Sequence, residues 1–149
     1  TSSLGDRAEG FYKGLEEVGL TCAGECILPR RTNDMLSSEP EPQYVKEIGA
    51  YLDGLDALPD SMVCTEYAIG RALYAAATKR GLKVGQDFKA CCIDENALAT
   101  QGSFFTHMHQ DEIRIAEETV RLLLALLSGG RPEPRDVRVP ARFFQGETT

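Results

Sequence analysis

Helical patterns and short apolar segments alternate along this chain, and that alternation restricts its possible folds more than any other feature. Apolar residues recurring every three to four positions predict helices over residues 3–18, 44–55, 66–81 and 111–130. Compact apolar runs predict strands over residues 20–28, 59–65, 87–94, 103–109 and 138–144, with a polar loop over residues 29–43. Strands separated by helices pair in parallel, so we expect an α/β fold: a mostly parallel sheet flanked by helices on both faces.

Length and charge favour a single soluble domain that does not itself bind nucleic acid. The chain has 149 residues, 42% of them apolar, which suffices for one hydrophobic core. A formal net charge of −7 disfavours contact with phosphate backbones, so a DNA-binding part would lie elsewhere. Neither a bilayer-spanning run nor a signal-peptide pattern occurs, so we expect a cytoplasmic protein without a membrane partner. The five cysteines, mostly in apolar runs, are predicted to be reduced thiols.

Three polar residues at the ends of predicted strands are the first candidates for a binding site. Asp94 ends the strand predicted over residues 87–94, and Thr65 and Glu66 come at the end of the strand predicted over residues 59–65. Ligands of parallel sheets bind outside the carboxyl ends of the strands, which makes all three candidate ligand contacts. Each of them can instead simply cap the turn that follows its strand.

Motifs for catalysis, nucleotide binding and metal binding find little support. The sequence contains neither a G-x-x-x-x-G-K-[ST] loop nor a G-x-G-x-x-G turn for phosphate binding. His107 and His109 point to one strand face and could join Cys22 or Cys26 around zinc, but their spacing fits no standard zinc pattern. A cysteine nucleophile with a histidine base stays an alternative, although nothing marks a cysteine as activated. We therefore predict no catalytic residue, no metal and no cofactor.

Four segments carry a family pattern in order. They read DRAEGFYKGLEEVGL, MVCTEYAIGRALYAAATKRGLKVGQDFKACCIDE, FFTHMHQDEIRIAEETVRLLLALLSGG and VPARFFQGETT. The first resembles an R-x-x-G-F helix, and the second a strand, an A-x-G helix and a G-f-D-D strand. The third resembles an L-T-T-v-x-Q-p crossover with its helix, and the fourth a closing strand with its tail. Together they resemble the effector-binding domain of LacI/GalR-type transcriptional regulators, a periplasmic-binding-protein-like type I fold.

The resemblance implies a two-lobed domain with a small effector, such as a sugar or a purine, bound between the lobes. Residues 1–149 would form a single partial effector-binding domain. Residues 1–103 would be its C-terminal lobe, and residues 104–149 a crossover strand, a helix and a closing strand that pack with an N-terminal lobe preceding this chain. The implied function is ligand sensing in a homodimeric bacterial regulator, which contacts operator DNA through a helix-turn-helix head outside this chain. A solute-binding protein or a receptor sensor module shares the architecture and stays the alternative.

The resemblance also assigns roles to individual residues. Arg7 matches the effector-binding arginine of the R-x-x-G-F helix, and Asp94 matches the first acid of the G-f-D-D segment. An arginine fork and a carboxylate suit ligands that carry hydroxyls or heterocyclic nitrogens. Where the family has Asn-Asp, this chain offers Thr65 and Glu66 if one residue is missing before the A-x-G helix, or Cys64 and Thr65 if no gap is allowed. The usual amide is missing on either alignment, and His107 replaces a threonine of the crossover.

The position of Arg7 is unusual because the dipole of a helix disfavours a cation in its first turn. Asp6 offsets part of that cost, and we expect Phe11 to anchor the helix in the core. Arg7 can then reach over the strand ends toward Asp94 or a ligand. The simpler alternative is a surface ion pair with Asp6 or Glu9.

The helix predicted over residues 111–130 is apolar on more than one side and needs cover on more than one face. In the family this helix packs in the N-terminal lobe. In this chain alone its apolar faces would be exposed beyond what soluble proteins usually leave uncovered. We therefore expect the chain to associate through this helix or to exchange it with a second copy.

Overall fold

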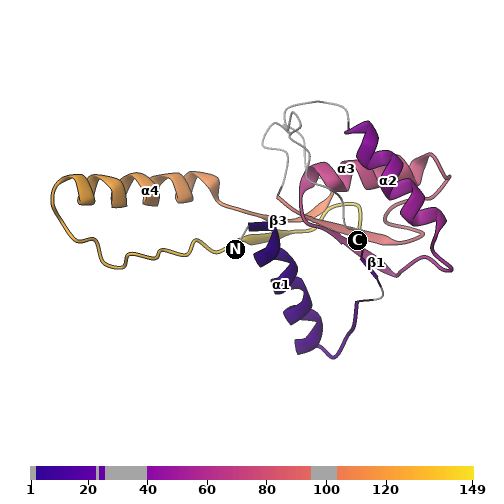
Figure 1. Cartoon of the computed structure of the whole chain (residues 1–149), viewed down its shortest axis with the longest axis horizontal. Coiled ribbons are helices and arrows are strands. Elements are labelled where there is room, and N and C mark those ends of the chain that lie inside the picture. Colours follow the sequence, from indigo (N-terminus) through magenta and orange to yellow (C-terminus); the bar gives the residue numbers. More distant parts are fainter. Residues whose placement is uncertain (1–2, 23, 26–39, 95–103) are drawn as a thin grey trace.

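The computed structural model describes residues 3–22, 24–25, 40–94 and 104–149 (Figure 1). The helices in these ranges are α1 (Ser3–Glu17), α2 (Pro42–Asp53), α3 (Tyr67–Thr78) and α4 (Glu112–Leu127). The strands are β1 (Ser61–Cys64), β2 (Lys89–Ile93), β3 (Thr106–His109) and β4 (Arg142–Phe144). Each of these elements lies within or close to a predicted one, and most of the loop predicted over residues 29–43 lies outside the described residues.

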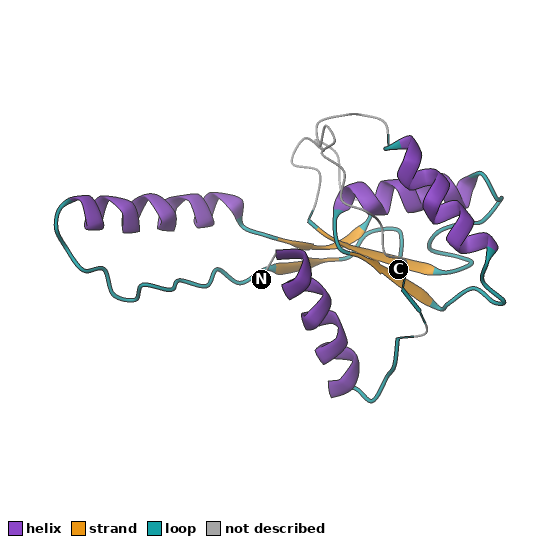
Figure 2. Cartoon of the chain, viewed as in Figure 1, coloured by secondary structure: helices purple, strands orange, loops and turns teal. Residues whose placement is uncertain are grey.

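The strands form one mostly parallel sheet, as predicted, in the order β1-β2-β3-β4 (Figure 2). The pairs β1–β2 and β2–β3 are parallel, and β4 returns antiparallel to β3. Because β1, β2 and β3 run in the same direction, they all end at the same edge of the sheet. The α/β prediction with a mostly parallel sheet is therefore confirmed.

The core lies between the sheet and the pair α2 and α3, which cover one face. Gly70 of α3 sits directly over β2, since a Cβ at this position would lie 3.4 Å from the Cβ atom of Cys92. A methyl group at this position would be in ordinary van der Waals contact with Cys92, so α3 lies directly against the sheet here. The buried apolar residues of this core come mainly from both helices, from β1 and β2, and from the segments that flank β2 and β3: Tyr44, Val45, Ile48, Leu52, Cys64, Ala72, Leu73, Ala76, Ala77, Val84, Phe88, Ala90, Cys92 and Phe105.

The opposite face of the sheet is covered less than the sequence predicts. Val63, which alternates with the buried Cys64 along β1, keeps 43% of its surface exposed. In Figure 1, α1 lies on this side of the sheet, but its backbone makes no close approach to another helix or strand in the described ranges. Phe11 is only half-buried and is not part of the core, so the expectation that it anchors α1 there is wrong. The side chain of Arg7 makes the long-range contact instead.

The strand predicted over residues 20–28 is not formed in its described part. Residues 20–22 and 24–25 have no strand structure, and residues 26–28 lie outside the described ranges. A short segment gains strand structure only by pairing with a sheet edge, and Gly24 lowers its intrinsic preference for doing so. The prediction is therefore wrong for residues 20–22 and 24–25.

The C-terminal tail closes the sheet through a threonine that sequence reasoning did not single out. Thr148 is fully buried, at 0% exposure. Its Oγ1 donates to the Ala90 carbonyl at 2.7 Å and accepts from the Thr106 backbone N–H at 3.0 Å. The Ala90 N–H in turn donates to the Thr148 carbonyl at 2.8 Å. These bonds tie β2 to the start of β3 at the edge opposite the strand ends.

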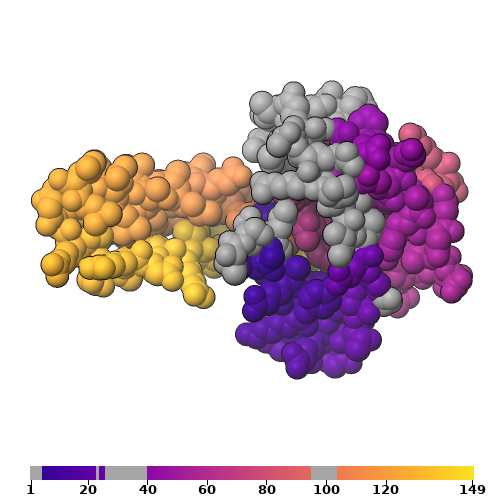
Figure 3. Space-filling view, in the orientation of Figure 1, coloured from indigo at the N-terminus to yellow at the C-terminus, as the bar shows by residue number. Residues whose placement is uncertain are grey.

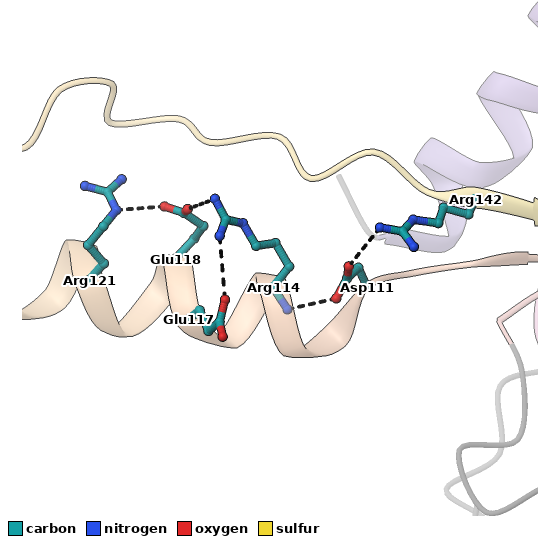
Figure 4. Close-up of polar contacts among 6 residues, drawn as sticks. All are labelled: Asp111, Arg114, Glu117, Glu118, Arg121 and Arg142. Carbon is teal, nitrogen blue, oxygen red and sulfur yellow. Dashed lines mark hydrogen bonds and ion pairs between the residues drawn. The ribbon is translucent and has the colours of Figure 1, made fainter. Parts of the chain in front are cut away.

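The helix α4 and the extended segment that returns from it project away from the sheet. We call residues 112–141 the α4 arm (Figures 1 and 3). No residue of α4, all of which the structure describes, is buried, and Ile113 and Leu127 each keep 75% of their surface exposed. Arg114, Glu117, Glu118 and Arg121 form a chain of ion pairs along the helix, with nitrogen–oxygen distances of 2.8 to 3.6 Å (Figure 4). The exposed apolar faces expected from the sequence are present. No helix in the described part of the chain is long and apolar enough to cross a bilayer.

An arginine–carboxylate pair joins the ends of α2 and α3. The Nε and Nη2 atoms of Arg80 donate to the two oxygens of Asp53 at 2.6 and 2.5 Å, and Nη1 donates to the Ala76 carbonyl at 3.1 Å. Hydrogen bonding to Arg80, supported by its charge, lowers the pKa of Asp53 below its ordinary value. The bidentate geometry makes this pair a stronger contact than most surface ion pairs.

We expect the 149-residue chain to associate through α4. Multi-angle light scattering across a concentration series should report a mass above that of one chain. Leu124→Glu should lower that mass, because it places a charge within the exposed apolar faces. Thr119→Glu adds the same charge to α4 without removing apolar surface and serves as the control. A clean monomer at high concentration for the unmodified chain contradicts the expectation.

The Asp53–Arg80 pair should make stability depend on pH in a defined direction. A carboxyl with a lowered pKa in the folded chain adds stability above its ordinary pKa of 3.8 and loses it as the pH falls through the lowered value. Asp53→Asn should therefore lower the urea midpoint near pH 7, and the difference from the unmodified chain should shrink toward about pH 2.5. Asp56→Asn, an exposed change in the loop that follows α2, is the control. A difference that is equal at both pH values would assign the effect to something other than this charge.

Candidate functional site

The candidate site lies at the edge where the three parallel strands end. Thr65 follows β1, Asp94 follows β2 and Gln110 follows β3, so three consecutive strands each place a polar residue at one edge. The register Cys64↔Cys92↔His107 keeps these strand ends level with one another. Sheets of this kind present such residues to a ligand outside their carboxyl edge.

Arg7 reaches this edge from α1 and contacts two of the three strand ends. Its Nη2 donates to Oδ2 of Asp94 at 2.7 Å, and its Nη1 donates to the Thr65 carbonyl at 2.7 Å. The side chains of Arg7 and Asp94 keep 18% and 28% of their surface exposed. The pair is thus partly shielded from water and still accessible to a ligand. Asp94 lies 87 positions from Arg7 in the sequence. Arg7 therefore pairs with a distant carboxylate, whereas the simpler alternative was an ion pair with its neighbours Asp6 or Glu9.

Asp94 is held in place from several directions. Its Oδ1 accepts a hydrogen bond from Nε2 of Gln110, while its backbone N–H donates to the Met108 carbonyl at 3.0 Å. Its backbone has φ of 71°, in the left-handed region that aspartate and asparagine tolerate better than most residues. The carboxylate therefore has a fixed orientation before any ligand binds.

Thr65 and Glu66 differ from the expectation that polar side chains at the strand ends form the site. Thr65 contributes its backbone carbonyl to Arg7 rather than its side chain. Glu66 is the N-cap of α3, with extended backbone, and its half-buried side chain makes no capping hydrogen bond. The side-chain hydrogen bonds of Arg7 and Asp94 go to one another, to the Thr65 carbonyl and to Gln110 rather than to that side chain. Arg7, Asp94 and the Thr65 carbonyl thus form the centre of the site, with Glu66 beside it in the chain.

Gln110 is the site residue that sequence reasoning missed. Its position could have identified it, because Gln110 directly follows the strand predicted over residues 103–109. Asp94 and Thr65 were chosen because they end the strands predicted before it. The family pattern contains this glutamine, yet no property of the sequence indicated that its side chain turns back to the carboxylate rather than outward.

The histidines and cysteines do not form a metal or catalytic centre in the described residues. No group of three or more histidine, cysteine or acidic side chains there could hold a metal ion. The ring of His107 stacks on Phe144 at 5.4 Å with an interplanar angle of 7°, and its Nδ1 is 2.9 Å from the Phe105 carbonyl. Cys22, Cys64, Cys91 and Cys92 form no disulfide, and burial raises the pKa of the Cys91 thiol. Cys26 lies outside the described residues.

The central residues can form hydrogen bonds with a polar ligand. Arg7 and Asp94 neutralise each other and present donors and acceptors in fixed directions at a partly buried edge. Such a surface selects polar ligands by the geometry of their hydroxyl, carbonyl or ring-nitrogen groups.

The sequence pattern of the periplasmic binding protein-like domain matches residues 2–149. The chain belongs to this family. It is 27% identical over 142 residues to the HTH-type transcriptional repressor PurR of Yersinia enterocolitica, a match that covers 95% of this chain and 39% of the relative. The resemblance to LacI/GalR-type effector-binding domains is confirmed, and the relative is a transcriptional regulator rather than an enzyme.

Solved structures support the same fold. A Lac repressor dimer bound to operator and the anti-inducer ONPF superposes with a TM-score of 0.74 at 20% identity, over 96% of this chain and 46% of that one. A LacI family regulator from Enterococcus faecium with bound ribose superposes with a TM-score of 0.72 at 17% identity, over 98% of this chain and 51% of that one. The chain therefore spans about half the length of these relatives or less, and it has the fold of that part.

Labelling of Cys91 tests the nucleophile alternative. Because burial raises the pKa of this thiol, its thiolate fraction near neutral pH is smaller than that of a free cysteine. Iodoacetamide should alkylate Cys91 more slowly than it alkylates N-acetylcysteine, as followed by peptide mass spectrometry under native conditions. The same measurement in urea is the control for intrinsic reactivity. Faster labelling of Cys91 than of the free thiol would restore a cysteine nucleophile.

Proposed function

We propose that this chain is the ligand-sensing and dimerising portion of a LacI-type bacterial transcriptional regulator, and that Arg7, Asp94, Thr65 and Glu66 bind its effector. The observation that carries the proposal is the Arg7 fork, which joins Asp94 and the Thr65 carbonyl at the carboxyl edge of a parallel sheet. The PurR relative and the Lac repressor likeness support the same reading.

The geometry favours an uncharged effector, such as a sugar or a purine. Arg7 and Asp94 already balance each other's charge, so a ligand with a full charge would leave one of them unpaired at a partly buried edge. A hydroxyl can accept from Arg7 and donate to Asp94 without that cost, and a heterocycle can do the same with one ring nitrogen that accepts and a ring N–H that donates. Ribose bound to the Enterococcus faecium regulator is a ligand of this kind.

The effector would act by shifting a conformational equilibrium without chemical change. A ligand that binds one orientation of two lobes more tightly than the other increases the population of that orientation. Residues 1–103 would supply the C-terminal lobe, while residues 104–149 would cross to an N-terminal lobe and return. The regulator would be a cytoplasmic homodimer that meets operator DNA through a head outside this chain, as the Lac repressor dimer is bound to operator.

A solute-binding protein or receptor sensor module would use the same edge for its ligand. The PurR relative favours the regulator, because its match covers 95% of this chain. A signal peptide or transmembrane helix upstream of this chain in its gene would favour the alternative, whereas a helix-turn-helix would favour the regulator.

Replacing Arg7 should separate binding from folding. Calorimetric titration of the full-length protein with ribose, lactose, hypoxanthine and guanine should find a ligand. Arg7→Ala should weaken that binding by roughly 10- to 100-fold, because charge-assisted hydrogen bonds contribute most at such a site. The thermal midpoint should change little. Lys13→Ala, which removes an exposed cation from the same helix, should leave the affinity unchanged.

Two outcomes would count against the proposal. Unchanged affinity in Arg7→Ala would mean that the arginine is merely structural. Absence of any binder among sugars and purines would count against an effector of this class.

A further inference from the structure

We propose that Cys64 and Cys92 are a redox pair that regulates the candidate site, an inference that rests on the function proposed for that site. The two residues lie directly opposite each other on the parallel strands β1 and β2. Both belong to the core beneath α2 and α3, where they keep 6% and 0% of their surface exposed. Neither takes part in a disulfide, so the structure holds the pair in its reduced state.

The spacing of neighbouring strands lies within the range of a disulfide. Strands of a sheet are about 4.8 Å apart, and the Cα atoms of a disulfide are usually about 4.4 to 6.8 Å apart. The two Cβ atoms of a disulfide lie only about 3.8 Å apart, which is closer than the strands themselves. Closing the bond would therefore draw the ends of β1 and β2 together by roughly 1 Å.

A rotation of the Cys92 side chain would bring its sulfur toward Cys64. Its Sγ lies 3.7 Å from the Asp94 carbonyl oxygen and 3.9 Å from the Thr106 carbonyl oxygen, on the side of β3. Turning about the Cα–Cβ bond into another staggered position moves the sulfur toward β1. Gly70 of α3 lies over Cys92 and contributes no side chain to this space.

A peroxide is the class of oxidant that fits two buried thiols, because it is small. Cys64, the less buried of the two, attacks hydrogen peroxide as its thiolate and forms a sulfenic acid, while the O–O bond breaks. The hydroxide that leaves takes up the proton of this thiol and becomes water. The Cys92 thiol then attacks the sulfenic sulfur, the S–S bond forms and a second water leaves. Together the two thiols lose two protons and two electrons, and the peroxide is reduced to two waters.

Both cysteines lie close in the chain to residues of the candidate site. Thr65, whose carbonyl accepts from Nη1 of Arg7, directly follows Cys64. Asp94, whose carboxylate accepts from Nη2 of Arg7, comes two residues after Cys92. The guanidinium of Arg7 therefore spans the same two strands that the disulfide would draw together. Because the new bond changes the separation of the two acceptors, we expect the oxidised protein to bind its effector more weakly.

Cys91 provides a matched control in the same strand. Side chains alternate along a strand, so Cys91 and Cys92 point to opposite faces of the sheet. The partner of Cys91 on β1 is Val63, which offers no thiol. The proposal therefore requires Cys92 and does not require Cys91.

Peroxide treatment of the full-length protein tests the pair without any ligand. After hydrogen peroxide and then iodoacetamide, peptide mass spectrometry without reduction should show the Cys64 and Cys92 peptides linked, and dithiothreitol should separate them. Cys91→Ala should keep the link, which in that variant can involve only Cys92 of its peptide. Cys64→Ala and Cys92→Ala should each abolish it. Absence of the link in protein that circular dichroism shows to be folded, or a link that forms only in urea, would overturn the redox pair.

Affinity measurements distinguish failure of this inference from failure of the proposed function. The calorimetric titrations with ribose, lactose, hypoxanthine and guanine would be repeated after peroxide treatment and removal of the peroxide. Oxidation should weaken binding by roughly 10-fold in the unmodified protein and in Cys91→Ala, which corresponds to the loss of about one hydrogen bond. In Cys64→Ala the same treatment should leave the affinity as it was before oxidation.

Equal affinities of the linked and the reduced protein would overturn the regulation and leave the proposed function intact. If none of the compounds binds, the proposed function fails and the regulation fails with it. The peptide link still decides in that case whether the redox pair exists.

Discussion

The close packing of α3 on the centre of the sheet is the constraint on which the rest of this structure depends. At Gly70 the helix lies directly over β2, and a Cβ atom at this position would be 3.4 Å from the Cβ atom of Cys92. That contact, with α2 packed alongside α3, buries most of the apolar surface that the chain removes from water. It also holds β1 and β2 in register, so that their ends lie side by side where the candidate site forms.

Contacts between residues far apart in the sequence form the candidate site at one edge of this packed sheet. Asp94 and Thr65 follow from the parallel sheet, but Arg7 and Gln110 come from segments outside the packed core, and each reaches back to the same carboxylate. Within the described residues, neither α1 nor α4 makes a close backbone approach to another helix or strand. The side chain of Arg7 joins α1 to the strand ends, and the side chain of Gln110 joins the segment before α4 to the same carboxylate.

Local patterns predicted the elements well where a segment was long or was buried by its neighbours. The helices over residues 44–55 and 66–81 and the strand over residues 87–94 appear with ends moved by a few residues. The strand prediction over residues 20–28 was wrong in the described part of that segment. A strand needs a partner at the edge of a sheet, and a local sequence pattern does not show whether one is present. Phe11 was misplaced for a related reason: helical periodicity identifies the apolar face of α1, but not whether anything packs against that face.

The sequence by itself determined the α/β class, the mostly parallel pairing of the strands and the family, because these follow from local periodicity and from the order of four segments. It also identified Arg7 and Asp94 as candidates, through the family pattern and the rule for strand ends. Only the tertiary structure decided that Arg7 pairs with Asp94, that Thr65 offers its carbonyl, that Gln110 completes the carboxylate's contacts and that Thr148 is buried. Each of these contacts joins residues from about 16 to 87 positions apart. Which side chains meet across such distances depends on how the whole chain packs rather than on any local preference.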